Sequence, residues 1–247
     1  MKIQLRYHLA PKHGCPPEEC EDALGLNLEA RCFAVTDGAT EAFASGQWAR
    51  HLAHKWALSE VRPLEAHDFR AWVAAQGGIW HDTWKEKQLP WYAEAKERDG
   101  SFAAFVGLKF DEIPHPRWHA LALGDSCLFH RRDGKLLRAL PLDDADKFTA
   151  APQLVASRPE LHEASFATTV MASGEFQAGD VFWLASDAVA AWLLRAWREQ
   201  DEVAARLSEM LQEKRGAELN ELIEHQRQAG NMRDDDVALV RLEVLEL

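Results

Sequence analysis

The order in which strand and helix patterns follow one another constrains the fold of this chain most strongly. Alternating or continuous apolar residues predict three strands near the N-terminus, at 2–8, 23–28 and 31–36. Apolar residues then recur every three or four positions, which predicts two amphipathic helices within 43–56 and 69–84. The many tryptophans of these segments share that spacing, so we expect them to pack in the core.

The second part of the chain repeats this succession of strands followed by helices. Strand patterns recur at 101–110, 117–123, 127–131, 135–140, 181–186 and 237–247, and helical patterns at 189–199, 203–213 and 217–228. The pair Asp133-Gly134 predicts a tight hairpin between two of these strands. Because strands and helices come in blocks, the order favours an α+β fold with mostly antiparallel sheets over a doubly wound parallel sheet.

Nothing in the sequence marks a boundary between domains. The chain has no internal repeat, low-complexity tract or Gly/Ser-rich linker, so we expect one domain over residues 1–247. The segment 142–170 contains Pro152 and Pro159 and has weak periodicity, which predicts a long, partly irregular excursion. Such excursions in compact domains often form flaps beside a functional site.

Charge and cysteine content exclude several classes of function. The net charge of −12 disfavours binding to nucleic acid or to an anionic membrane, because both are polyanions. No run approaches the roughly 18 apolar residues of a membrane span, and the N-terminus lacks the pattern of a signal peptide. The four cysteines form no C-x-x-C pair and are too few for a disulfide framework, so we expect a cytoplasmic protein.

Acidic residues stand at the ends of several predicted strands. Asp37 and Asp187 each follow a strand, Asp125 lies between two strands, and Asp235 and the pair Glu21-Asp22 each precede one. In an antiparallel sheet the end of one strand lies beside the start of its neighbour, so these acids can meet at one edge.

Carboxylates that meet in this way repel one another unless cations neutralise them. Oxygen ligands suit Mg²⁺ or Mn²⁺, and the scattered histidines show no spacing typical of a zinc site. Two such ions would activate a water for attack on phosphorus and offset the developing negative charge. Each acid alone is more simply a helix cap or a turn residue, and only the set indicates a metal centre.

Five short motifs carry a resemblance to a known family. The segments "EDA", "VTDGAT", "ALGDSCL", "GDVFWLASDAV" and "RDDDVALV" occur in an order and spacing that resemble the metal-dependent protein phosphatases, the type 2C or PPM Ser/Thr phosphatases, in their bacterial form. The resemblance implies a four-layer α/β/β/α sandwich with two central antiparallel sheets and a binuclear Mg²⁺/Mn²⁺ site at one end. It also implies hydrolysis of phosphoserine or phosphothreonine in proteins phosphorylated by a Ser/Thr kinase, by direct attack of a metal-bridging water.

The resemblance assigns a role to each acid. Asp37 resembles the aspartate that bridges both metals, and Asp187 and Asp235 resemble the other ligands of the first metal, so these three would act through metal-bound water. Glu21 and the Gly38 carbonyl resemble ligands of the second metal, with Asp22 in the outer shell. Asp125 resembles a ligand of a third, weakly bound metal. Asp234 and Asp236 are register alternatives to Asp235.

Three positions depart from the family pattern. Ala39 stands where many members have a histidine general acid, and Ala188 follows Asp187 where glycine is usual. Pro17 stands where the phosphate-binding arginine is expected, which leaves the phosphate-binding cation open, with Lys12 as a weak candidate.

Two alternatives come from other classes. The first is a phosphatase-like module that binds a partner without turnover, which the missing histidine and arginine motivate. The second is an esterase with Ser126 of Gly124-Asp125-Ser126 as nucleophile, although no Asp-x-x-His pair follows near the C-terminus.

Overall fold

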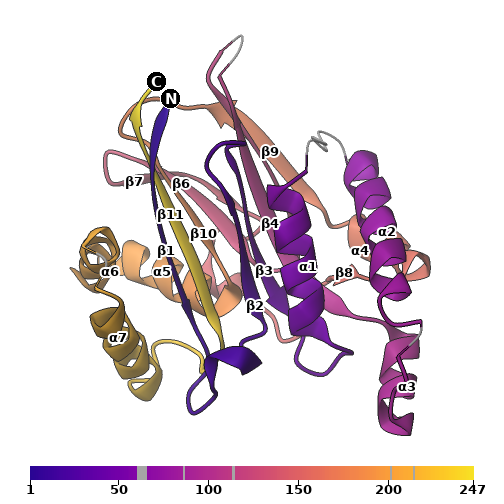
Figure 1. Ribbon diagram of the computed structural model, residues 1–247. Coiled ribbons are helices and arrows are strands. Elements are labelled where there is room, and N and C mark those ends of the chain that lie inside the picture. The colour runs from indigo at the N-terminus through magenta and orange to yellow at the C-terminus, as the bar shows by residue number, and fades with distance from the viewer. Residues whose placement is uncertain (60–65, 86, 113–114, 201, 214) are drawn as a thin grey trace.

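A computed structural model describes residues 1–59, 66–85, 87–112, 115–200, 202–213 and 215–247. Two antiparallel sheets lie at its centre (Figure 1). The first sheet contains, in spatial order, β1 (Lys2–Ala10), β11 (Val237–Glu246), β10 (Val181–Ala185), β6 (Cys127–Arg132) and β7 (Lys135–Leu140). The second contains β2 (Asp22–Asn27), β3 (Cys32–Gly38), β4 (Phe102–Asp111), β5 (Arg117–Leu123) and β9 (Val170–Glu175), and the short β8 (Val155–Ala156) pairs with β4.

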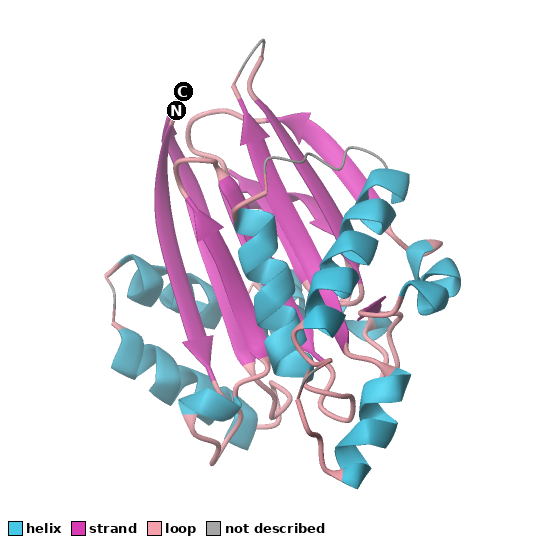
Figure 2. Ribbon diagram, turned by 45° about the vertical axis from the view of Figure 1, so that its right-hand side comes forward, coloured by secondary structure: helices cyan, strands magenta, loops and turns pink. Residues whose placement is uncertain are grey.

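Helices cover the outer faces of both sheets, in front of and behind the strands in Figure 2. The helices α1 (Ser45–Ala57) and α2 (Ala66–Asp82) cover the second sheet, and α5 (Asp187–Glu199), α6 (Glu202–Gln212) and α7 (Gly216–Gln228) cover the first. The layers are therefore α/β/β/α, as the sequence predicted.

Three layers of apolar side chains hold these elements together. Phe33, Phe182 and Val240 are fully buried between the two sheets. Trp48 and Phe69 are fully buried between the second sheet and its helices, and a third cluster around Val189 and Leu239 joins the first sheet to α5. Burial of this apolar area is the main favourable term in folding, so each layer stabilises the position of its sheet.

The tryptophans of α1 and α2 pack in the core, as their spacing predicted. Trp48, Trp56, Trp72 and Trp80 are each at most 8% exposed. Trp91 differs, because it is 82% exposed at the start of α3 (Trp91–Asp99). The prediction that the tryptophans pack in the core is therefore confirmed for α1 and α2, which cover a sheet.

Most predicted elements are present within one or two residues of their expected bounds. The hairpin at Asp133-Gly134 joins β6 to β7, and both residues have positive φ, 49° and 75°, as a two-residue turn of this type requires. Segment 142–170 forms only short elements, namely η2 (Ala145–Lys147), β8, η3 (Pro159–Leu161), α4 (His162–Phe166) and the first residue of β9.

Two of the longer elements were not predicted. Helix α3 has the sequence WYAEAKERD, in which no apolar stripe marks a core-facing side. Strand β9 has the sequence VMASGE and lies at the edge of the second sheet, where its side chains are exposed or half-buried. Both elements lack the buried apolar face on which a pattern-based prediction depends.

The four cysteines are free thiols. Within the described residues, no helix has both the length and the apolar character needed to cross a membrane.

Candidate metal centre

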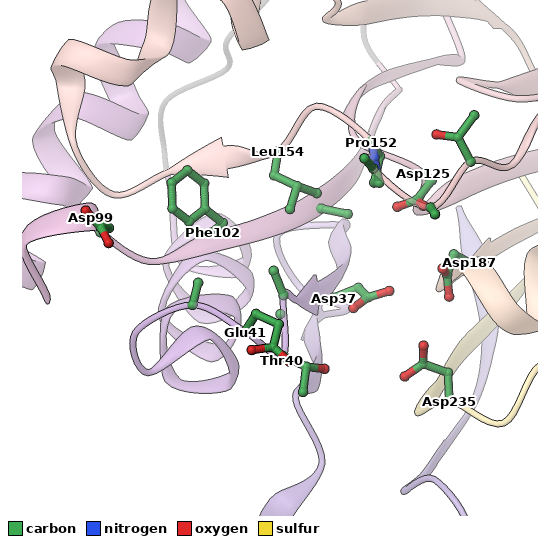
Figure 3. A pocket seen from close by; sticks show the side chains of 18 of the residues that line it. Asp37, Thr40, Glu41, Asp99, Phe102, Asp125, Pro152, Leu154, Asp187 and Asp235 are labelled. Carbon is green, nitrogen blue, oxygen red and sulfur yellow. The ribbon is translucent and has the colours of Figure 1, made fainter. Parts of the chain in front are cut away.

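The acids singled out in the sequence lie at one edge of the sandwich, where strands of both sheets end (Figure 3). Asp37 is the second-last residue of β3, Asp125 lies in the turn between β5 and β6, and Asp187 is the first residue of α5. Asp235 comes two residues before β11. The connection from β5 to β6 crosses from one sheet to the other, so the four positions join both halves of the molecule.

Three of these acids converge. Asp37, Asp125 and Asp187 each offer one carboxylate oxygen, and the three oxygens lie within 4.8 Å of one another. They line a cleft of about 740 Å³ together with Asp235, Gly38, Ala39 and residues 149–152 and 154 of the predicted excursion. The cleft therefore brings acids from four separate segments next to part of the 142–170 segment.

The pairing of β10 with β11 positions Asp187 and Asp235. Ala185 lies opposite Leu239 in an antiparallel register, so the end of one strand meets the start of the other. Beyond the ladder, the Ser186 amide donates to the Ala238 carbonyl at 3.0 Å, and the Ala238 amide donates to Ser186 Oγ at 2.9 Å. These bonds hold the two acid-bearing loops together at the start of α5.

Two glycines allow the backbone to approach closely at the other acids. Gly124, just before Asp125, has a φ of 108°, and an added Cβ would lie 2.6 Å from the Ala104 Cβ. An added Cβ on Gly38 would lie 2.7 Å from the Ser45 carbonyl carbon at the start of α1. Both positions require the small size of glycine, and Gly124 also requires its freedom to adopt a positive φ.

Burial and mutual repulsion raise the pKa of the clustered acids. Burial, and then the charges of Asp22, Asp187 and Asp125, raises the pKa of Asp37 well above its usual value. Burial, and then the charge of Asp187, raises the pKa of Asp125 to about 7. Asp22 lies opposite Asp37 in the β2–β3 ladder and is 1% exposed, and burial, then Asp236 and Asp187, raises its pKa as well. The cluster therefore carries an excess of negative charge that a cation would relieve.

The donor set fits a hard divalent cation. Asp187 Oδ1 is buried and accepts no hydrogen bond from any described residue, although a buried carboxylate oxygen normally has a partner. All the clustered donors are carboxylate oxygens, which are the preferred ligands of Mg²⁺ and Mn²⁺. The site could thus hold such an ion between Asp37, Asp125 and Asp187.

An arginine that the sequence analysis did not consider lies against the same acids. The Arg233 guanidinium forms an ion pair with Asp187 Oδ2 and lies 2.8 Å from Asp235 Oδ2. It also lines the cleft. Its place directly before the Asp run of "RDDDVALV" was the available signal, but an arginine beside acids is too common to stand out.

The three consecutive aspartates have different surroundings. Both carboxylate oxygens of Asp236 accept backbone amides, from Lys12 at 2.8 Å and from Glu21 at 2.7 Å. Asp234 accepts the His13 amide at 2.9 Å and does not line the cleft. Asp235 lines the cleft, so of the three it has the position that the resemblance requires.

Glu21 and Lys12 lie beside the centre and not in the cleft. The Glu21 carbonyl accepts the Gly38 amide at 3.3 Å, while its carboxylate lies 3.8 Å from Lys12 Nζ. Burial raises the pKa of Glu21. Lys12 is thus paired with an acid of the predicted site and is not among the residues that line the cleft.

The surroundings of Ser126 do not suit an esterase nucleophile. Ser126 is fully buried, and its Oγ contacts no hydrogen-bond partner among the described residues. A nucleophilic serine needs a base within hydrogen-bond reach and access to substrate. No histidine is among the residues that line the cleft beside it.

The fold and the acid-lined edge together define the class of structure to which this chain belongs: it has the fold of the PPM-type Ser/Thr phosphatases. It is similar to the photosystem II phosphatase PBCP, with a TM-score of 0.63, 14% identity and 100% of both chains covered. It is similar to the catalytic domain of the phosphatase PstP in complex with two manganese ions, with a TM-score of 0.58, 21% identity and coverage of 99% and 100%.

A third similar structure is MsPP of Mycobacterium smegmatis, a PPM Ser-Thr phosphatase in complex with cacodylate. Its TM-score is 0.55, its identity 16%, and 98% of both chains is covered. The sequence itself matches no protein-family profile and no curated protein. The likeness therefore lies in the three-dimensional structure.

Proposed function

We propose that this chain is a Mg²⁺/Mn²⁺-dependent phosphoprotein phosphatase of the PPM family that hydrolyses phosphoserine or phosphothreonine. The observation that carries the proposal is the convergence of Asp37, Asp125 and Asp187, whose oxygens lie within 4.8 Å of one another in an open cleft. The shared fold with PPM-type phosphatases supports it.

In this proposal each residue of the centre has a defined task. Asp37, Asp187 and Asp235 would hold the first cation, with Asp37 shared between two. The Gly38 carbonyl and Glu21 would serve the second, Asp22 would support them from the outer shell, and Asp125 would serve a third. When bound, such ions supply an acidified water as the nucleophile and offset the charge of the phosphoryl group.

The side of the cleft that the 142–170 segment forms would receive the phosphorylated segment of a protein. Residues 149–152 and 154 form one side of the cleft, so the 142–170 excursion would act as a flap that shapes substrate choice. Ala39 carries no proton donor, so the leaving hydroxyl would take its proton from water in the cleft. The substrate would be a protein phosphorylated by a Ser/Thr kinase. The protein would act in the cytoplasm, which the free cysteines support.

The competing function is a phosphatase-like binding module. The ion pair of Arg233 with Asp187 and Asp235 favours this alternative, because it already neutralises two of the acids. The two functions differ in turnover, not in fold.

Hydrolysis of p-nitrophenyl phosphate and of a phosphothreonine peptide, with Mn²⁺ and with EDTA, tests the proposal. Asp187→Asn should lower Mn²⁺-dependent turnover by about a hundredfold or more, since loss of even an outer-shell partner typically costs 10–100-fold. Asp82→Asn is the matched control, because Asp82 is a 66% exposed acid at the end of α2, outside the cleft. Turnover that persists in EDTA or in Asp187→Asn would refute the metal mechanism, and Mn²⁺ binding without turnover would favour the binding module.

A further inference from the structure

Arg233 occupies a position that the proposed function does not explain. It lies between α7 and β11, and its side chain is 55% exposed while its guanidinium contacts Asp187 and Asp235. The guanidinium contacts the Oδ2 atom of each acid, and its positive charge would oppose the binding of a divalent cation at the neighbouring oxygens. The arginine is therefore in direct competition with the metal.

Arg233 is also the cation beside the acid cluster. Among the described residues, the cations that line the cleft are Arg233 and Lys96. Lys96 is exposed on α3, three residues before Asp99, and Figure 3 places Asp99 at the opposite end of the cleft from Asp187 and Asp235. An anion bound next to the acid cluster would thus lie nearer to Arg233 than to Lys96.

If cations occupied the carboxylates, the electrostatic interaction of the Arg233 guanidinium with its surroundings would change from attractive to repulsive. The guanidinium loses its acidic partners and is repelled by the bound ions, but its backbone keeps it at the cleft. A phosphoryl group drawn to those ions would offer oxygens in the planar arrangement that a guanidinium binds through two parallel hydrogen bonds. The half-exposed side chain has room to change its rotamer.

We infer that Arg233 is a displaceable counter-ion: it neutralises Asp187 and Asp235 in the metal-free protein, and after metal binding it binds the phosphoryl oxygens of the substrate. This inference rests on the proposed function, since it assigns the phosphate-binding cation of the same site. It also gives the role that Pro17 cannot perform to a residue from the other end of the chain. Metal binding and phosphate binding are then coupled through one side chain.

The test uses the full chain and two binding measurements that need no turnover. Calorimetry measures the Mn²⁺ affinity of the metal-free protein and the affinity of the Mn²⁺-loaded protein for inorganic phosphate. Arg233→Ala should bind Mn²⁺ about tenfold more tightly and phosphate about tenfold to a hundredfold more weakly, the range expected for loss of a charge-assisted hydrogen bond. Arg233→Lys should recover part of the phosphate affinity, because lysine restores the positive charge but not the two parallel N–H donors of the guanidinium.

Lys96→Ala is the matched control, because it removes a cation from the other end of the same cleft. Its Mn²⁺ and phosphate affinities should equal those of the wild type. Loss of phosphate affinity in Lys96→Ala but not in Arg233→Ala would overturn the inference, as would unchanged affinities in Arg233→Ala. Mn²⁺ binding by Arg233→Ala alone, with none by the wild type, would also overturn it, since Arg233 would then be a permanent substitute for the metal.

The two hypotheses fail in different ways. If both affinities change as expected and no phosphoester is hydrolysed, the exchange of Arg233 stands while the proposed enzymatic activity fails. If phosphoesters are hydrolysed and neither affinity depends on Arg233, the activity stands and the inference fails.

Discussion

At the scale of single residues, the proposed metal centre is a cluster of buried acids whose mutual repulsion costs stability in the metal-free protein. Asp37 and Asp125 both have a raised pKa because they are buried beside other acids. In the folded state they keep their protons at pH values where the unfolded chain has lost them. Through these two acids the folded protein binds more protons than the unfolded protein between about pH 4 and about pH 7, so their contribution to the stability of the metal-free protein falls as pH rises through that window.

Asp37→Asn should therefore stabilise the metal-free protein at high pH. The neutral amide has nearly the same shape as the carboxylate but repels none of the neighbouring acids. At pH 8 in EDTA we expect the free energy of unfolding to rise by about 2 kcal/mol, and the gain should be largely lost at about pH 3, where Asp37 is mainly protonated in both states. Urea unfolding at the two pH values measures this difference.

The matched control is Asp99→Asn, because Asp99 is an exposed acid at the far end of the cleft. It should leave the stability unchanged at both pH values. An Asp37→Asn protein that is less stable than the wild type at pH 8 would contradict the idea that these acids are strained by repulsion.

At the scale of elements, close contact between β3 and α1 shapes the centre. Gly38 ends β3, and α1 begins so close to it that an added Cβ would lie 2.7 Å from the Ser45 carbonyl carbon and 2.8 Å from the Gly46 amide nitrogen. Both contacts are with backbone atoms, which cannot rotate away. A larger residue would have to separate the strand from the helix.

Gly38→Ala should therefore destabilise the protein by about 1–3 kcal/mol, the usual cost of overpacking, and weaken Mn²⁺ binding because Asp37 would shift. Gly78→Ala is the matched control: Gly78 lies on α2, and an added Cβ there meets no atom within 4 Å. That variant should be neutral or more stable by up to about 1 kcal/mol, since alanine favours a helix. Thermal unfolding and Mn²⁺ titration measure both effects, and equal stability of the two variants would contradict the steric argument.

The elements themselves were predictable to different degrees. Strands with a buried apolar run, such as β4 and β10, were predicted within one residue at each end. Helix α3 and edge strand β9 were not predicted, because neither buries an apolar face. A pattern of apolar residues indicates only those helices and strands that bury one face or all of their side chains.

At the scale of the whole molecule, the metal centre joins the two sheets. Asp37 is the second-last residue of a strand of the second sheet, Asp187 and Asp235 flank strands of the first, and Asp125 lies on the connection between the sheets. A cation bound there can be held only when both sheets are docked. Binding of a cation at this proposed centre would therefore be thermodynamically linked to folding.

Mn²⁺ should raise the stability of the wild-type protein. At a free concentration 100 times the Kd, one site contributes about 2.7 kcal/mol to the free energy of unfolding. Urea unfolding with Mn²⁺ and with EDTA measures the gain, and Asp187→Asn should lose it. A midpoint that does not move with Mn²⁺ would contradict binding at a centre shared by the two sheets.

The assignment of residues 1–247 to one domain stays a prediction.

The residue pattern alone predicted the α+β class and the set of acids, because burial leaves a periodic trace and each acid follows or precedes a readable strand. The four-layer sandwich was implied by the resemblance of five motifs to a known family. Only the tertiary structure decided which acids meet, that Asp235 and not Asp236 lines the cleft, and that Arg233 lies among them. The physical reason is that contacts between distant segments depend on strand register and side-chain direction. Neither property leaves a periodic signal in the chain.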